Sequence, residues 1–141
     1  MSCILPGDAM KADPMQSGFK DLLGHRVAEW GPDQVVVELD IGPQHLNLAG
    51  TVHGGVLASL IDVAGSLSGL YSPNESDMRR AVTLSLTTNF TGQASSGRIR
   101  AVANKRAGGA SIYFSSVEIS DDAGQIIAIG EVVNRYRKTA D

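Results

Sequence analysis

Disulfide bonds and an excess of basic charge are both absent from this 141-residue sequence. Its one cysteine, Cys3, excludes an intramolecular disulfide and fits a reducing compartment. Lysine and arginine together number 12 against 15 aspartate and glutamate residues, which gives a net charge of −3. Nucleic-acid-binding domains normally present a basic face, so we expect no nucleic-acid partner. We expect a cytoplasmic protein.

Long uninterrupted apolar runs are missing as well. The nearest candidate, residues 48–74, is broken by His53, Asp62 and several glycines, so we expect no contact with a membrane. The first 15 residues carry prolines and charges in place of the apolar core of a signal peptide. We predict one domain over residues 15–141, preceded by a flexible N-terminal tail over residues 1–14.

Hydrophobic periodicity predicts one long helix and six strands. A short amphipathic helix over 15–23 comes first, and residues 54–70 are apolar on almost every side, as in a buried helix. Two strands precede the long helix and a meander of four strands follows it. A single antiparallel sheet wrapped around one long central helix, an α+β fold, satisfies this order. The predicted strands cover residues 25–30, 34–41, 82–90, 98–106, 112–119 and 125–136.

Two of these strands have patterns that predict local geometry. In the strand over 82–90, Thr83 and the other polar residues alternate with apolar ones, Phe90 among them. In the strand over 112–119 the apolar positions change phase, which predicts a bulge near residues 115–116.

Asp62 stands alone in the apolar helix. The positions at helical spacing from it hold small residues, with Gly65 and Ser66 on one side, and none carries a positive charge. A buried carboxylate without a partner is costly, so this residue is a candidate general base or nucleophile. The small neighbours leave room for a ligand beside it. Alternatively, Asp62 pairs with a distant arginine or is solvated at an interface.

Gly54 and Gly55 stand where the long helix is expected to begin. Backbone N–H groups there lack intrahelical partners, and glycine lets a ligand approach them closely. Such donors can form an oxyanion hole for a carbonyl under attack, although a helix start with unusual dihedral angles is an equal explanation. Eight residues of helix place Gly54 roughly 12 Å from Asp62. If both act on one carbonyl, they must come from two subunits, so a working site predicts at least a dimer.

Four further residues are weaker candidates. His53 could polarise a carbonyl or act as a base, or it could hold the turn by side-chain hydrogen bonds. Asn47 could brace the loop or orient an attacking water. Lys105 and Arg106 could bind a polyanionic ligand tail or simply be solvated at a hairpin end. The histidines and Asp62 match no spacing of a metal-ligand set, so we expect no metal.

The segment over residues 47–55, followed by Asp62, resembles the N-x-x-G-x-x-H-G-G…D pattern of hotdog-fold acyl-CoA thioesterases. The branch it resembles most is the phenylacetate-degradation, or PaaI-type, group, and the resemblance covers roughly residues 17–137. It implies a sheet curled around the 54–70 helix and subunits paired into homodimers, commonly into homotetramers.

The resemblance also assigns roles to individual residues. Gly54 would supply the oxyanion-hole amide, and Asp62 of the partner subunit would act as general base or nucleophile. Asn47 and His53 match the family's polar residues beside the thioester. Thr83 falls where related enzymes carry a serine or threonine near the attacking water.

Coenzyme A is expected as part of the substrate rather than as a cofactor. The family's pantetheine arm runs along a strand at the subunit interface, which makes residues 105–113 a wall for it. The implied reaction is hydrolysis of an acyl-CoA to a carboxylic acid and coenzyme A. Two alternatives stay open: a hotdog acyl-CoA hydratase or dehydratase, and a non-catalytic acyl-CoA-binding domain. The candidate substrate-binding residues are Gly55, Ser66, Lys105, Arg106, Gly108 and Gly109.

Overall fold

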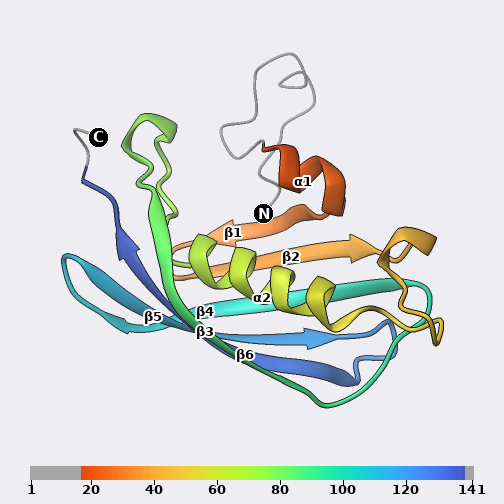
Figure 1. Cartoon of the computed structure of the whole chain (residues 1–141). Helices are drawn as coiled ribbons and strands as arrows, with labels where there is room; N and C mark the ends of the chain where they lie inside the picture. Colours follow the sequence, from red (N-terminus) through yellow and green to blue (C-terminus); the bar gives the residue numbers. More distant parts are fainter. Residues whose placement is uncertain (1–16, 139–141) are drawn as a thin grey trace.

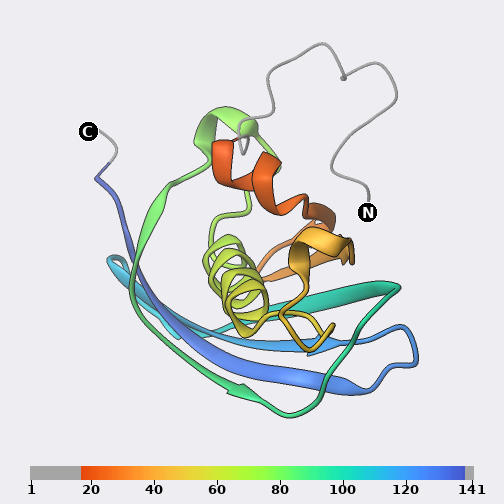
Figure 2. The same cartoon turned by 45° about the vertical axis from the view of Figure 1, so that its right-hand side comes forward.

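One six-stranded antiparallel sheet curls around helix α2 (Gly54–Leu67), as Figures 1 and 2 show. The computed structural model describes residues 17–138, so the predicted tail over residues 1–14 lies outside the described residues. A short helix, α1 (Gly18–Leu23), precedes the sheet. Two 3₁₀ helices, η2 (Pro43–His45) and η3 (Glu75–Asp77), lie in the connections before and after α2. In sheet order the strands are β1 (Arg26–Gly31), β2 (Gln34–Asp40), β4 (Arg98–Gly108), β5 (Ile112–Ser120), β6 (Ile126–Tyr136) and β3 (Ala81–Phe90). The predicted α+β architecture is confirmed.

The order of the strands corrects the predicted meander of four. Strands β4, β5 and β6 do form a meander, but β3 pairs with β6 at the edge of the sheet, and β4 pairs with β2. Strand β2 carries three consecutive buried valines, Val35 to Val37, and because successive side chains point to opposite faces, both faces of the sheet are covered there. Periodicity shows which residues form strands, whereas the choice of partners depends on contacts between residues distant in the sequence.

Helix α2 ends three residues before the predicted position, with Ser68 as its C-cap. The hydroxyl groups of Tyr113 and Tyr136 donate to carbonyls at this end of the helix, at 2.7 and 2.9 Å, and so tie it to β5 and β6. Burial, with a contribution from Tyr136, raises the pKa of the Tyr113 hydroxyl, which therefore remains a donor even at a pH where an exposed tyrosine would begin to ionise. The residues of α2 that are buried against the sheet are Leu57, Leu60, Ile61, Ala64, Gly65 and Leu67.

Gly65 lets α2 approach β6 closely. A Cβ atom at this position would overlap the side chain of Val132, which already fills the space. The prediction that the small residues around Asp62 leave room for a ligand is therefore wrong for Gly65, because this glycine serves the packing of the helix on the sheet.

A β-bulge at Leu84 sets which side chains of β3 face the helix. Thr83 lies opposite Asn134 of β6, whereas Ser85 lies opposite the preceding residue of the pairing, Val133. The extra residue reverses the alternation, so Thr83 and Phe90 both face α2 although seven positions separate them. The strict period-two pattern predicted from the sequence therefore fails at Leu84.

The bulge predicted near residues 115–116 lies instead in the neighbouring strand. Lys105 pairs with Ser115 and Ala107 with Phe114, so the extra residue is Arg106 of β4. The apolar pattern of β5 changes phase for a different reason: Phe114 is exposed on the outer face, while Tyr113 and Val117 point into the core.

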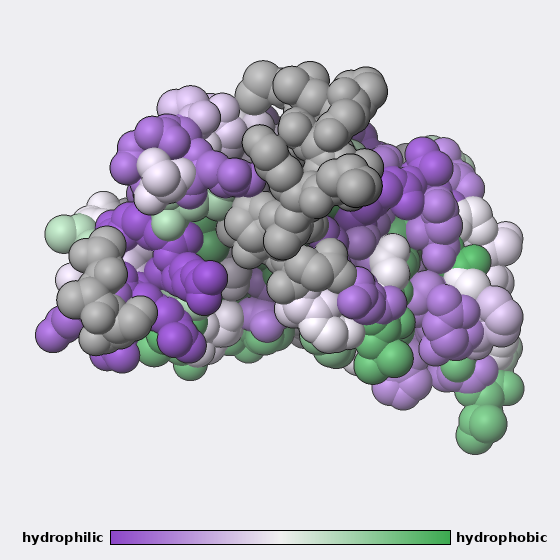
Figure 3. Space-filling view, turned by 90° about the horizontal axis from the view of Figure 1, so that it is seen from above, coloured by the Kyte–Doolittle hydropathy of each residue, from purple (hydrophilic) through white to green (hydrophobic). Residues whose placement is uncertain are grey.

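Seen from above, the face in Figure 3 is largely hydrophilic, with hydrophobic side chains gathered in separate patches. Within residues 17–138, no helix is long and apolar enough to span a membrane.

Candidate active site

The first turn of α2 leaves one backbone donor open. His53 is the N-cap residue, and its Nδ1 accepts a hydrogen bond from the Gly55 N–H at 2.9 Å. The N–H groups of Val56 and Leu57 donate to the His53 carbonyl. Within the described part of the chain, the Gly54 N–H has no acceptor. The histidine therefore has the geometry of a residue that holds the turn, and Gly54 presents the free amide.

An aromatic ring flanks this amide. A methyl group added at Gly54 would lie 3.2 Å from Cζ of Phe90, which is tighter than an ordinary contact. Phe90 ends β3, and 56% of its surface is exposed. The ring therefore lies on the side of Gly54 where a side chain would project, next to the turn that presents the open amide. Nothing in the local sequence pattern indicated Phe90, because its position depends on the bulge in β3.

Asn47 organises the loop that leads to the helix. Its Oδ1 accepts from the backbone N–H groups of Ala49 and Thr51, at 2.9 and 3.1 Å, and its Nδ2 donates to the Thr51 hydroxyl at 3.0 Å. The backbone N–H of His53 donates to the carbonyl of His45, which fixes the end of the same loop. This geometry matches the bracing role that the sequence left open for Asn47.

Asp62 lies half-exposed on α2, and its Oδ1 accepts a hydrogen bond from the Thr83 hydroxyl at 2.6 Å. Among residues 17–138 no lysine, arginine or histidine forms an ion pair with it, so the alternative of a distant arginine partner has no support there. A carboxylate held by a single hydroxyl group keeps its other oxygen available for chemistry.

Thr83 connects Asp62 to a buried amide. The Ser66 hydroxyl donates to Oδ1 of Asn134 at 2.8 Å and lies 3.3 Å from the Thr83 oxygen. Asn134 is fully buried in β6. Sequence reasoning missed Asn134, although a lone asparagine among the apolar residues of the last strand was a signal.

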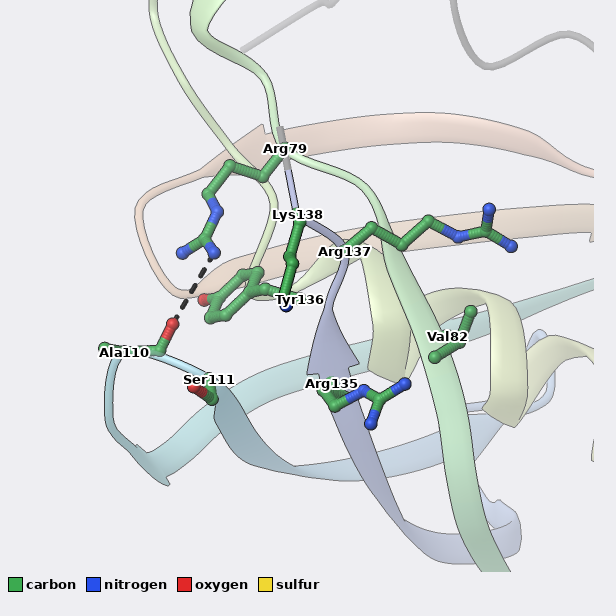
Figure 4. A pocket seen from close by; sticks show the side chains of 8 residues that line it. All are labelled: Arg79, Val82, Ala110, Ser111, Arg135, Tyr136, Arg137 and Lys138. Atoms are coloured by element: carbon green, nitrogen blue, oxygen red, sulfur yellow. Dashed lines mark hydrogen bonds between the residues drawn. The ribbon is translucent and has the colours of Figure 1, made fainter. Parts of the chain in front are cut away.

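A basic cavity with a volume of about 740 Å³ lies where β3 and β5 begin and β6 ends (Figure 4). The Arg79 guanidinium lies 3.7 Å from the centre of the Tyr136 ring and donates to the carbonyl of Ala110 at 3.5 Å. Among the residues that the structure describes, four cationic residues and no carboxylate line this cavity, so it favours an anionic ligand. Its lining is Arg79, Val82, Ala110, Ser111, Arg135, Tyr136, Arg137 and Lys138.

Of the region predicted as a wall for coenzyme A, residues 105–113, Ala110 and Ser111 line this cavity. The four residues singled out in that region, Lys105, Arg106, Gly108 and Gly109, are not among its lining residues. Lys105 reaches within 5.9 Å of the Tyr113 ring centre, and Arg106 is exposed at the bulge of β4. Gly108 packs against Tyr113, whereas Gly109 adjoins open space. The cations at the end of β6 were missed because the sequence gives no reason to bring them close to Arg79.

A family model described as the thioesterase superfamily matches residues 49–128, which is more than half of the chain. The curated protein Rv1847 of Mycobacterium tuberculosis, described as a candidate esterase, is 30% identical over 115 residues, which cover 81% of this chain and 82% of that protein. Human acyl-coenzyme A thioesterase 13 is 26% identical over 126 residues, which cover 87% of this chain and 88% of that protein.

Solved structures of related proteins have the same fold as this chain. The structure of the Mycobacterium tuberculosis protein superimposes with a TM-score of 0.79 at 29% identity, covering 87% of this chain and 98% of that one. A mutant of the phenylacetic acid degradation protein PaaI from Thermus thermophilus gives a TM-score of 0.73 at 27% identity, covering 86% and 100%. The hotdog resemblance is thus confirmed, and the chain belongs to the thioesterase superfamily.

Proposed function

We propose that this protein hydrolyses acyl-CoA thioesters to a carboxylic acid and free coenzyme A. The observation that carries the proposal is the open Gly54 amide at the start of α2, in a thioesterase-superfamily chain whose helix also presents the Asp62 carboxylate. Human acyl-coenzyme A thioesterase 13, which matches most of the chain, supports acyl-CoA as the substrate class.

In the proposed mechanism the thioester oxygen accepts a hydrogen bond from the Gly54 N–H at the positive end of the helix. As a nucleophile attacks the carbonyl carbon, negative charge gathers on that oxygen, and the fixed donor stabilises it. Asp62 either takes a proton from the attacking water or attacks the carbon itself and is released by hydrolysis. In both routes the carbon–sulfur bond breaks, and the sulfur leaves with the electron pair of that bond. It becomes the thiol with the proton that Asp62 took from water in the first route, or with a proton from solvent in the second.

A second copy of the chain would complete this site. Gly54 and Asp62 are separated by roughly 12 Å of helix, too far for one carbonyl to contact both. Strand β3 is an edge strand that exposes Leu84, Leu86 and Phe90. Because an edge strand has unpaired backbone groups and these side chains are apolar, β3 favours pairing with another chain. We place the homodimer contact along β3, so that Asp62 of one subunit faces Gly54 of the other.

The basic cavity suits the phosphate groups of coenzyme A. Arg79, Arg135, Arg137 and Lys138 can each donate to phosphate oxygens, and the Ser111 hydroxyl lies among them. An Arg135→Ala variant is expected to raise KM for an acyl-CoA several-fold. The same variant should leave KM unchanged for the matching acyl-pantetheine thioester, which lacks the nucleotide. Equal effects on both substrates would contradict phosphate binding in this cavity.

Release of free thiol from a panel of acyl-CoAs tests the reaction. Asp62→Asn is expected to abolish release while circular dichroism and the dimer's elution volume remain unchanged. Asp77→Asn, on the exposed η3 helix, is the matched control and should retain full turnover. Binding without thiol release would indicate a binding domain, and a changed acyl chain without thiol release would indicate a hydratase or dehydratase. Full turnover by Asp62→Asn would overturn the assignment of Asp62.

A further inference from the structure

Asn134 is a polar side chain that the core packing does not require. None of its surface is exposed, and it lies in β6 between the buried Val132 and Tyr136. Within the described residues its Nδ2 has no hydrogen-bond partner. Burying an amide with an unmet donor is costly, whereas leucine has a similar size and no such cost. The amide therefore calls for a role other than packing.

The pairing of β3 with β6 connects this amide to the carboxylate. Thr83 lies directly opposite Asn134, and the bulge at Leu84 turns Thr83 toward α2. Ser66 of α2 contacts both residues, with its oxygen 2.8 Å from the Asn134 amide and 3.3 Å from the Thr83 hydroxyl. Thr83 then donates to Asp62 at 2.6 Å. Three elements thus meet in one chain of polar contacts that ends on Asp62.

The number of available protons determines which group donates to which in this series of hydrogen bonds. Ser66 and Thr83 have one hydroxyl proton each, and the short contact to the carboxylate takes that of Thr83. The two ends of an amide have nearly the same shape, so a half-turn of the Asn134 side chain brings its nitrogen to Ser66 without changing the packing. Each group then donates to the next: Asn134 to Ser66, Ser66 to Thr83, and Thr83 to Asp62. The half-turn gives the nitrogen an acceptor and moves the amide oxygen to the position that has no partner among the described residues, so an unmet donor is exchanged for an unmet acceptor.

We propose that Asn134 is a positioning residue for Asp62, acting through Ser66 and Thr83; this inference rests on the proposed thioesterase function. This series of hydrogen bonds from Asn134 through Ser66 and Thr83 to Asp62, here called the relay, holds the Thr83 proton toward Oδ1 of Asp62. It thereby fixes the orientation of the carboxylate. Oδ2, which no donor within residues 17–138 reaches, is left to act on water or on the thioester. A small loss of orientation in a reacting group lowers turnover far more than it lowers substrate binding.

A double-mutant cycle tests the relay. Asn134→Leu is expected to lower kcat about tenfold with KM unchanged, because the carboxylate loses its fixed geometry while the substrate contacts remain. Thr83→Val removes the last donor and should lower kcat at least as much. Because Asn134 acts through Thr83, the double variant should be no slower than Thr83→Val alone. Multiplicative losses, or a full kcat for Asn134→Leu, would overturn the proposal.

Two further variants separate the relay from general damage. Asn104→Leu makes the same change at a half-buried residue of β4 and should keep wild-type kcat. If Asn134→Leu does not fold, Ser66→Ala takes its place, and the cycle then combines Ser66→Ala with Thr83→Val. Ser66→Ala removes the middle hydroxyl group, which lies on the half-exposed face of α2. The same criterion then applies to the combined effect.

Nuclear magnetic resonance gives a readout that needs no turnover. The Asn134 side-chain amide protons are expected to exchange slowly with water and to shift when Thr83 is changed to valine. If wild-type protein releases no thiol but these signals respond as expected, the proposed function fails and the relay stands. If thiol is released but the signals do not respond to Thr83→Val, the relay fails and the proposed function stands.

Discussion

At the scale of single residues, Gly54 at the start of α2 can act in two ways, through its backbone amide and through its lack of a side chain. Gly54 offers a free amide, and it also lacks a side chain where Phe90 lies close by. The sequence alone indicated Gly54, Asp62, Asn47 and His53, because one short motif contains the turn and the acid. It could not indicate Phe90, and it could not connect Asn134 with Asp62, because both placements depend on the pairing and the bulge of β3.

Gly54→Pro removes the amide proton while keeping the helix. Proline is well suited to the first helical position, and the preceding His53 is already extended, with φ −62° and ψ 137°. Gly54→Ala adds a comparable contact with Phe90 but retains the N–H. If the amide is the oxyanion donor, the proline variant should lose about 10²–10³-fold in kcat relative to the alanine variant.

The matched control is Gly18→Pro, at the first position of α1, where Ser17 is likewise extended. Its kcat should equal that of the wild type, and the melting temperatures of all three variants should be similar. Equal kcat values for Gly54→Pro and Gly54→Ala would show that the Gly54 amide takes no part in catalysis.

At the scale of elements, the sequence predicted where the strands lie but not how they pair. The period-two runs gave all six strands, since alternation is a local property. The position of β3 beside β6 was missed because it is fixed by contacts such as Thr83 with Asn134, which are 51 residues apart. The phase of β3 was missed for a related reason: a bulge shows itself only against the partner strand.

The packing of α2 on β6 predicts a compensating pair of substitutions. Gly65→Ala forces a methyl group into the Val132 side chain and is expected to destabilise the fold by about 1–3 kcal/mol. Val132→Ala alone leaves a cavity and should also destabilise it. Together the two changes conserve volume, so the double variant should be more stable than the sum of the single effects predicts.

Urea unfolding of the four proteins measures this coupling. Gly124→Ala is unsuitable as a control because its positive φ of 81° adds backbone strain. Gly18→Ala, whose Cβ would meet nothing within 4 Å, is suitable and should change stability little. Additive effects of Gly65→Ala and Val132→Ala would show that the helix moves away from β6 instead of pressing against it.

At the scale of the whole molecule, the two groups of the sequence motif, the Gly54 amide and the Asp62 carboxylate, lie at separate positions along one helix. A single chain presents an open backbone amide at one end of α2 and a carboxylate two turns later. Two copies joined along β3 in two-fold symmetry would bring unlike halves together twice, because such an interface repeats every contact. The proposed function therefore depends on an assembly that one chain cannot provide.

Mixing two inactive variants tests this division directly. Gly54→Pro lacks the amide donor and Asp62→Asn lacks the carboxylate, so each homodimer is expected to be inactive. A heterodimer contains one site in which both groups are intact, formed by Gly54 of one subunit and Asp62 of the other. Random exchange makes half of the dimers heterodimers, each with one of two sites working, so about a quarter of wild-type activity should return. If both groups instead belonged to one chain, every site would lack one of them, and mixing would restore nothing.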